Sequence, residues 1–131
     1  MKALILVSVL LATPLLATPA GAITAAEQLA GYARESGVAA DPARGQALFT
    51  QGQGREWRCA SCHTSDPTAE GQHARTAKRI APLAPAAHPQ RFTDAAKTEK
   101  WFRRNCNDVL GRTCTAGERA DVLAWLLSFG H

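Results

Sequence analysis

Two cysteines and a histidine stand together near the middle of the chain, in the run Cys59-Ala60-Ser61-Cys62-His63. Two thiols separated by two residues, with an imidazole directly after the second, have the spacing of c-type haem attachment. The sulfurs would bond to the two vinyl groups of haem, and His63 would bind the iron as proximal ligand. A zinc site would need further Cys or His ligands at short spacing, and a thioredoxin-like pair would need a βαβ context. Neither is evident nearby, so the pattern predicts one covalent haem c.

The start of the chain has the features of a secretory signal peptide. A lysine and a long apolar run precede Ala20-Gly21-Ala22, which is a small-x-small cleavage site. A membrane anchor is the alternative, but Pro14 and Pro19 interrupt the run, and a spanning helix needs about 20 apolar residues. We therefore expect residues 1–22 to be the signal and residues 23–131 to form one monohaem cytochrome c domain. Its expected location is the bacterial periplasm, where disulfides persist and haem c is attached.

The charge of the chain is mildly basic. Fifteen Lys and Arg residues stand against 11 Asp and Glu residues, which gives a formal net charge of +4. The basic residues form no cluster, so the composition does not favour a nucleic-acid partner. Four side chains are of types that suit haem propionates, and the sequence leaves the choice open among Trp57, Arg79, Arg103 and Arg104.

Helix start and stop signals recur along the chain. Capping boxes at Thr24–Glu27 and Thr115–Glu118 open two helices, and Asp41 followed by Pro42 opens another. A further helix is expected from about Thr93-Asp94 to Gly111. No stretch alternates with the period of a half-buried strand, so the predicted fold is all-α. Residues 80–89 contain three prolines and cannot be helix interior. They are expected to form an apolar wall at the porphyrin edge, or else a surface linker.

The distal ligand of the haem iron cannot be the usual methionine. Electron-transfer cytochromes c commonly place a methionine sulfur opposite the histidine. Met1 is the only methionine here, and it lies in the expected signal peptide. The other side chains that could bind the iron are His73, His88, His131, Tyr32, Asn105, Asn107 and the lysines Lys78, Lys97 and Lys100.

One of the two asparagines points into an apolar face. With Trp101 at 0° on a helical wheel, Asn105 falls at about 40° and Val109 at about 80°. Asn107 falls at about 240°, on the side of the arginines. A polar amide within an apolar arc must be hydrogen-bonded or must coordinate something. Geometry alone leaves two interpretations of Asn105 open, a cap for a loop carbonyl and a ligand of the iron.

Several motifs resemble those of known haem proteins. The run Asp41-x-x-Arg44-Gly45-x-x-Leu48-Phe49 ahead of CxxCH, with a closing amphipathic helix, resembles the class I cytochrome c plan. More narrowly, motifs in the same order along nearly the whole chain after the signal resemble the sphaeroides haem protein family: Ile80–Pro85, Arg91-Phe92-Thr93-Asp94, Glu99-Lys100-Trp101, Arg104-Asn105-Cys106-Asn107, Gly111-Arg112-x-Cys114-Thr115 and Ala120-Asp121-x-Leu123-Ala124-Trp125-Leu126. Residues 50–58 match this family least well.

The resemblance implies a class I cytochrome c-like helical fold around one covalently bound haem. It implies that Asn105, directly before the first cysteine of a disulfide, is the distal ligand. It further implies that Asn105 leaves on reduction, so that the ferrous haem is five-coordinate and high-spin and binds O₂, NO or CO. A dihaem cytochrome c is the implied electron donor. The role would be gas binding or a small oxidase-like activity. The alternative is a plain electron carrier with a stable six-coordinate haem, with His63 and His88 as its ligands.

A disulfide is expected between Cys106 and Cys114. They are the two cysteines that remain when Cys59 and Cys62 carry the haem, and the expected compartment is oxidising. Gly111 lets the chain turn after the helix and return towards Cys106.

The first prediction is that the exported protein keeps its haem through denaturing electrophoresis. Thioether bonds at Cys59 and Cys62 do not dissociate, so a haem stain should mark a band slightly below the 14.0 kDa of the full chain. Protein produced with a cytochrome c maturation apparatus but lacking a haem-stained band would contradict the attachment.

Overall fold

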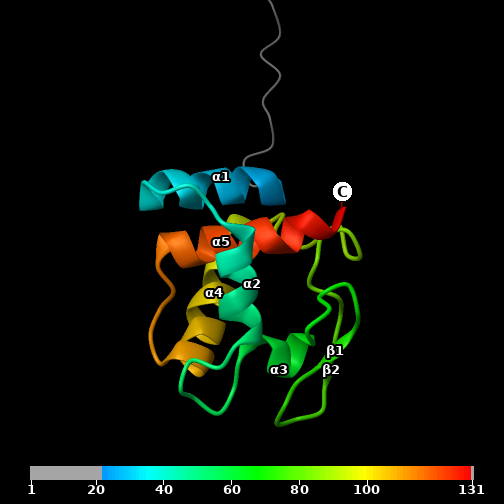
Figure 1. Cartoon of the computed structure of the whole chain (residues 1–131). Helices are drawn as coiled ribbons and strands as arrows, with labels where there is room; N and C mark the ends of the chain where they lie inside the picture. Colours follow the sequence, from blue (N-terminus) through cyan, green and yellow to red (C-terminus); the bar gives the residue numbers. More distant parts are fainter. Residues whose placement is uncertain (1–21, 131) are drawn as a thin grey trace, which may run out of the picture.

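The computed structural model describes residues 22–130. The expected signal peptide, apart from Ala22, and His131 therefore lie outside the described residues. The elements are α1 (Ala25–Ser36), α2 (Pro42–Thr50), α3 (Cys59–His63), β1 (Gly71–Gln72), β2 (Arg79–Ile80), α4 (Ala95–Leu110), α5 (Ala116–Leu127) and a 3₁₀ turn, η1 (Ser128–Gly130) (Figure 1). Within residues 22–130, no helix is long and apolar enough to cross a membrane.

Helices α1, α2, α4 and α5 begin at the capping residues predicted from the sequence, and α4 ends at the predicted Gly111. Both capping boxes form, with Thr24 Oγ1 accepting from the Glu27 amide and Thr115 Oγ1 accepting from the Glu118 amide. A side-chain oxygen of Asp41 caps α2, and that of Asp94 caps α4. The left-handed glycines Gly37 and Gly111 end α1 and α4. The all-α prediction is confirmed.

The hairpin β1–β2, like the short helix α3 and the turn η1, was not predicted from the sequence pattern. Its two strands pair antiparallel, Gly71 opposite Ile80, and are too short to display an alternating pattern. Gly71 also allows a close approach to α3, because a Cβ built on it would lie 2.1 Å from the carbonyl oxygen of Cys62. The hairpin therefore packs against the C-terminal end of the short helix α3.

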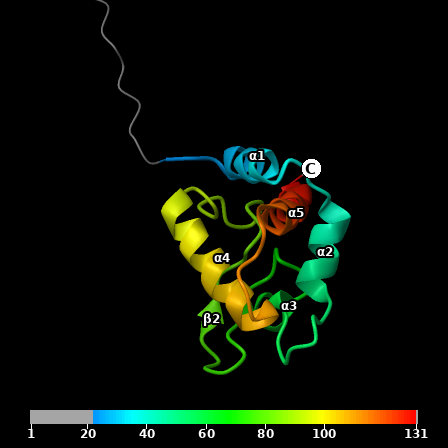
Figure 2. The same cartoon turned by 90° about the vertical axis from the view of Figure 1, so that its left-hand side faces the viewer.

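Helix α5 has more buried residues than any other helix of the described part. Its buried residues include Ala120, Leu123 and Leu126, and α1 and α2 pack against it from different sides (Figures 1 and 2). The crossing of α2 and α5 is close at Gly45, where an added Cβ would lie 1.9 Å from the carbonyl oxygen of Asp121. The sequence motif that carries Gly45 thus marks a backbone-to-backbone contact between two helices.

The proline-rich segment is packed onto the core and is not a surface linker. Ala84 is fully buried, and Leu83 packs against the main apolar cluster. The backbone amides of both residues donate to the carbonyl oxygen of Pro67 at 2.9 Å. The other expectation, a wall at the porphyrin edge, stays a prediction.

The second prediction compares two helical glycines. Gly45→Ala should lower the free energy of unfolding by about 1–3 kcal/mol, because the methyl group must push α2 and α5 apart. Gly31→Ala in α1 is the control, since its Cβ would meet only the Arg34 guanidinium at 4.0 Å. That change should raise the free energy of unfolding by about 0.5–1 kcal/mol. Urea unfolding of the haem-loaded protein measures both, and equal effects would contradict the close crossing.

Candidate haem site

Helix α3 brings the two thiols and the imidazole to one side. Cys59, Cys62 and His63 stand at positions i, i+3 and i+4, which share a face of a helix. Both thiols are free and half-buried. Burial raises the pKa of the Cys59 thiol to about 11, so this sulfur is a neutral thiol near neutral pH. The arrangement presents two sulfurs and one ring nitrogen to a single group lying against α3.

The imidazole of His63 is suited to bind a metal. Its ring lies 6.1 Å from the ring of buried Phe49 on α2. Burial, followed by the nearby positive charge of Arg91, lowers the pKa of His63 to about 4. The ring is therefore neutral at neutral pH, and a neutral imidazole is the form that coordinates iron.

Arg91 is a site residue that the sequence analysis did not single out. Its guanidinium is partly buried and donates from Nε to the carbonyl oxygen of Pro82 at 2.8 Å and from Nη2 to that of Ala81 at 2.6 Å. Burial lowers its pKa, but an arginine so placed stays charged. Its family motif was recognised, yet nothing in the motif says that a loop arginine is turned inward beside His63.

The four propionate candidates named from the sequence lie nearer the surface. Arg79 pairs with Glu70 and Arg104 lies over the Trp101 ring, while Arg103 is exposed. Trp57 is half-buried beneath the Arg75 guanidinium. The partly buried, charged guanidinium of Arg91 beside His63 suits a propionate better than the exposed guanidinium groups of Arg79, Arg103 and Arg104.

Helix α4 is amphipathic but packs closely along its length against no other helix of the described part. Trp101 is 44% exposed, and Phe102 and Leu110 are half-buried. Val109 is buried, although it lies on the same apolar arc as Trp101. An amphipathic helix normally buries its apolar stripe against another element. The incompletely covered stripe of α4 therefore needs an apolar partner other than a neighbouring helix.

Asn105 lies on this apolar side, as the periodicity predicted. It is half-buried, and no hydrogen bond of its amide is found within residues 22–130. The alternative role, a cap for a loop carbonyl, is thus absent from the described hydrogen bonds. Asn107 is exposed, also as predicted.

The other candidate ligands are placed less favourably. His73 accepts two backbone hydrogen bonds at Nδ1 in the hairpin turn, and Tyr32 is buried beneath the Arg119 guanidinium. His88 is half-buried in the proline-rich loop, and the exposed candidates are Lys78, Lys97 and Lys100.

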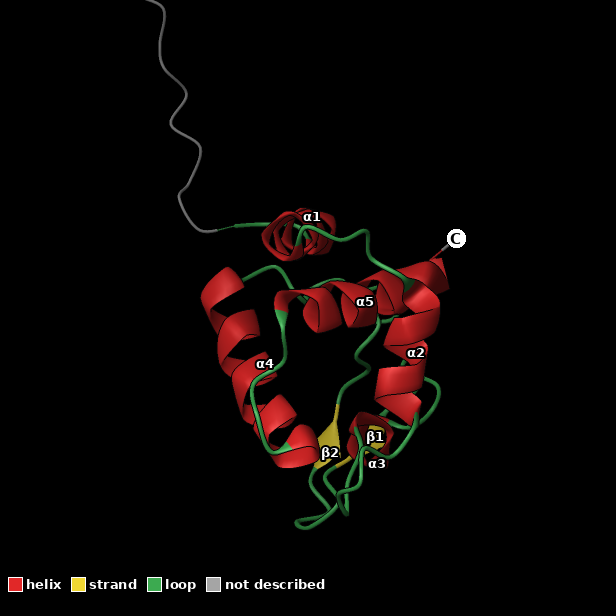
Figure 3. Cartoon of the chain, turned by 60° about the vertical axis from the view of Figure 1, so that its left-hand side comes forward, coloured by secondary structure: helices red, strands yellow, loops and turns green. Residues whose placement is uncertain are grey.

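The donor set and its surroundings fit a haem. Helices α2, α3, α4 and α5 surround the centre of the domain, with α2 and α4 on opposite sides (Figure 3). All four contribute to one apolar cluster, through Phe49, Ala60, Phe102 and Trp125. Within residues 22–130, no group of three or more His, Cys, Asp or Glu side chains could hold a bare metal ion. Two thiols, a neutral imidazole and an apolar lining are the groups that a covalently attached porphyrin requires.

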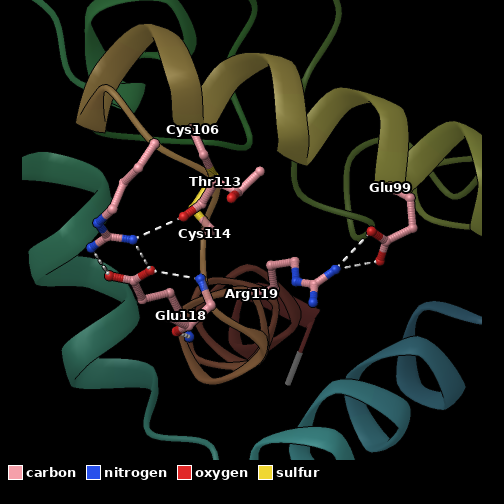
Figure 4. The surroundings of a disulfide bond; sticks show 8 residues. Glu99, Cys106, Thr113, Cys114, Glu118 and Arg119 are labelled. Atoms are coloured by element: carbon pink, nitrogen blue, oxygen red, sulfur yellow. Dashed lines mark hydrogen bonds and ion pairs between the residues drawn. A yellow bond between two sulfur atoms is a disulfide. The ribbon is translucent and has the colours of Figure 1, made fainter.

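A disulfide lies directly beside Asn105. It joins Cys106 near the end of α4 to Cys114, with the two Cα atoms 5.6 Å apart (Figure 4). The returning loop is held by Arg112, which donates two hydrogen bonds to the carboxylate of Glu118 at 2.8 and 2.7 Å. The backbone next to Asn105 is therefore tied to the start of α5.

The fold and the site define a class I-type monohaem cytochrome c. A family model described as "Domain of unknown function (DUF1924)" matches residues 35–126. The chain is 50% identical over 130 residues to "Cytochrome c-type protein SHP" of Cereibacter sphaeroides, covering 96% of this chain and 98% of that protein. It belongs to this sphaeroides haem protein family, and its cofactor is haem c.

Solved structures agree with this family. The structure of oxidised SHP, described as an oxygen binding cytochrome c, has a TM-score of 0.76 at 51% identity and covers 82% of this chain and 99% of that one. Oxidised cytochrome c'' of Methylophilus methylotrophus has a TM-score of 0.70 at 36% identity, covering 79% and 93%. Its sequence is 45% identical to this chain over 80 residues, which is 61% of this chain and 56% of that protein.

The third prediction concerns the disulfide. Replacing Cys106 and Cys114 together by alanine should lower the free energy of unfolding by roughly 2.5 kcal/mol, because the open loop gains entropy in the unfolded chain. Chemical denaturation of the haem-loaded variant measures the loss. Intact-mass analysis that found two free thiols in the native protein would contradict the bridge.

Proposed function

We propose that this protein is an exported, periplasmic monohaem cytochrome c with a distal ligand that leaves on reduction. Cys59 and Cys62 form the thioether bonds, His63 is the proximal ligand, and Asn105 is the distal ligand of the oxidised haem. The ferrous haem then binds O₂, NO or CO, in a gas-binding or oxidase-like role.

The observation that carries the proposal is the placement of the Asn105 amide. It is half-buried on the apolar side of α4 and has no hydrogen-bond partner within residues 22–130. Coordination to the iron would supply this half-buried amide with a partner that the described hydrogen bonds do not give it. The only methionine of the chain is Met1, so no methionine on α4 or in the loops around it can compete for the iron.

The chemistry of the amide oxygen indicates which redox state of the iron should bind Asn105 more tightly. Bound haem supplies a redox-active iron that accepts one electron and can bind a diatomic gas. The side-chain oxygen of Asn105 is a hard, neutral donor, so it binds the oxidised state more tightly than the softer reduced state. Trp101, Phe102 and Val109 lie on the same side of α4 and give the released position an apolar surrounding, which favours an uncharged gas over water.

The relatives support both parts of the proposal. SHP is described as an oxygen binding cytochrome c. The solution structure of cytochrome c'' is described as giving insights into the structural basis of haem-ligand detachment. We infer a redox partner for this chain as well, and a dihaem cytochrome c is the electron donor that the family resemblance favours.

A plain electron carrier is the second candidate function. Half-buried His88 is the observation in its favour, because two imidazoles would hold the iron in both redox states. The optical spectrum of the reduced protein under CO separates the two functions. A carrier with two strong ligands would not respond, whereas loss of Asn105 on reduction would leave a position that CO occupies.

The fourth prediction tests the ligand directly. Asn105→Ala should leave the oxidised haem open to water or an added anion and should change the oxidised spectrum. Asn105→Met places a soft sulfur at the same position and should give a low-spin reduced haem that rejects CO.

Asn107→Ala is the matched control, since it removes an amide from the exposed side of the same helix. Its spectra should equal those of the unaltered protein. The assignment would be wrong if Asn107→Ala or His88→Ala altered the oxidised spectrum while Asn105→Ala did not.

A further inference from the structure

We propose that Glu99 and Arg119 are positioning residues for the distal ligand. This inference rests on the proposed function of Asn105 as ligand. The pair holds α4 against α5 at a second point, two helical turns from the disulfide, and so fixes the direction in which Asn105 points.

The contacts of Arg119 join three helices. From α5, its Nη1 donates to Oε1 and Oε2 of Glu99 on α4 at 2.6 and 2.7 Å (Figure 4). Its Nη2 donates to Glu35 near the end of α1 at 3.2 Å. The guanidinium also lies 4.5 Å from the centre of the Tyr32 ring, which faces it from α1. Arg119 is therefore held from several directions and gives α4 a rigid point of attachment.

The pair and the disulfide act on the same face of α4. Glu99 and Cys106 are seven residues apart, which places them within about 20° on the helix and about 10 Å apart along it. Their partners, Arg119 and Cys114, lie near the start of α5. Phe102 stands between them and meets the Tyr32 ring edge-on at 6.0 Å. We call the Glu99–Arg119 pair and the Cys106–Cys114 bridge the two α4 anchors.

The two α4 anchors together restrict the tilt and rotation of α4, which the disulfide alone would permit. The disulfide fixes the position of Cys106, but α4 could still tilt or turn about that point. The ion pair two turns away removes this freedom. Asn105 precedes Cys106 and points about 100° away from it, so its direction follows the rotation of the helix. A coordinating group must be held within about 0.5 Å of its working position. Besides the two anchors, α4 contacts α1 through Phe102 against Tyr32 and through a hydrogen bond from Gln28 Nε2 to Thr98 Oγ1 at 3.2 Å, and the anchors add the contacts with α5 and with the loop before it.

Stability alone would not favour a buried arginine at position 119. Its side chain is only 13% exposed, and its Nε is the one buried side-chain polar atom without a hydrogen-bond partner within residues 22–130. Its partner Glu99 is 46% exposed, so the pair buries mainly the arginine, and apolar residues can often replace a buried charge and its partner without loss of stability. What apolar residues cannot supply is a directional contact that sets the position of one helix on another.

The test measures azide binding to the oxidised, haem-loaded protein, because azide competes with Asn105 for the iron. In Glu99→Gln, Asn105 is held less well, and the dissociation constant of azide should fall by about fivefold or more. Backbone amides of α4 should also exchange with deuterium faster. The double variant Glu99→Leu with Arg119→Met avoids an unpaired buried charge, so it should stay folded and show the same tighter azide binding.

Asp121→Asn is the matched control. Asp121 also forms an arginine–carboxylate pair on α5, accepting from Arg44 Nε at 2.7 Å, but this pair holds α2 and not α4. Its loss should lower stability and leave azide binding unchanged. If Asp121→Asn tightened azide binding as much as Glu99→Gln, the effect would be one of general stability and the proposal would fall.

A second comparison separates this inference from the proposed function. Asn105→Ala should tighten azide binding by itself, and adding Glu99→Gln to it should have no further effect. If Asn105→Ala leaves azide binding unchanged, the ligand assignment fails. If Asn105→Ala tightens azide binding and Glu99→Gln acts equally with or without Asn105, the ligand assignment stands and the positioning role is overturned.

Discussion

The burial of α5 is the constraint from which the positions of the other helices follow. The buried carboxylate of Asp121 accepts from the Asp41 amide and from Arg44, so the start of α2 is fixed against α5. Gly45 then lets the two backbones approach closely. The far end of α2 carries Phe49, which contacts both Trp125 on α5 and His63 on α3. The ring of His63 therefore lies beside the end of α2, whereas the Asp121 contacts hold the start of that helix.

Helix α4 obeys a different constraint. Its apolar stripe is only partly covered by other described helices, and in the proposed site the haem would supply the remaining packing partner. A domain of this size buries only about 65% of the surface that its unfolded chain exposes, and a porphyrin adds a large apolar body to such a small core. In the proposed site the cofactor would therefore complete the core beside α4.

What the sequence could predict was local. The capping residues of α1, α2, α4 and α5 act within one turn, and Asn105 lies within a single helical period of Trp101. The inward arginine and the second anchor depend on distant partners. Arg119 meets Glu99 across 20 positions and Glu35 across 84, and no spacing rule connects such residues. For the same reason, the sequence left two interpretations of the proline-rich loop open. The contact with distant Pro67 and the burial of Ala84 show that this loop packs inward.

In the proposed site, the two axial ligands of the haem would serve opposite purposes. His63 belongs to a helix of five residues whose two cysteines would bond to the cofactor itself, so the proposed proximal ligand would move with the haem. Asn105 belongs to a helix held to the protein by the two α4 anchors. An amide is a weak ligand, and a preference of 1.4 kcal/mol for one redox state changes its occupancy about tenfold. A ligand of that strength can bind in one redox state and leave in the other only under two conditions. Its helix must not force it against the iron, and its helix must still hold it close enough to bind. Anchors on the α5 side of α4, away from the face that carries Asn105, meet both requirements.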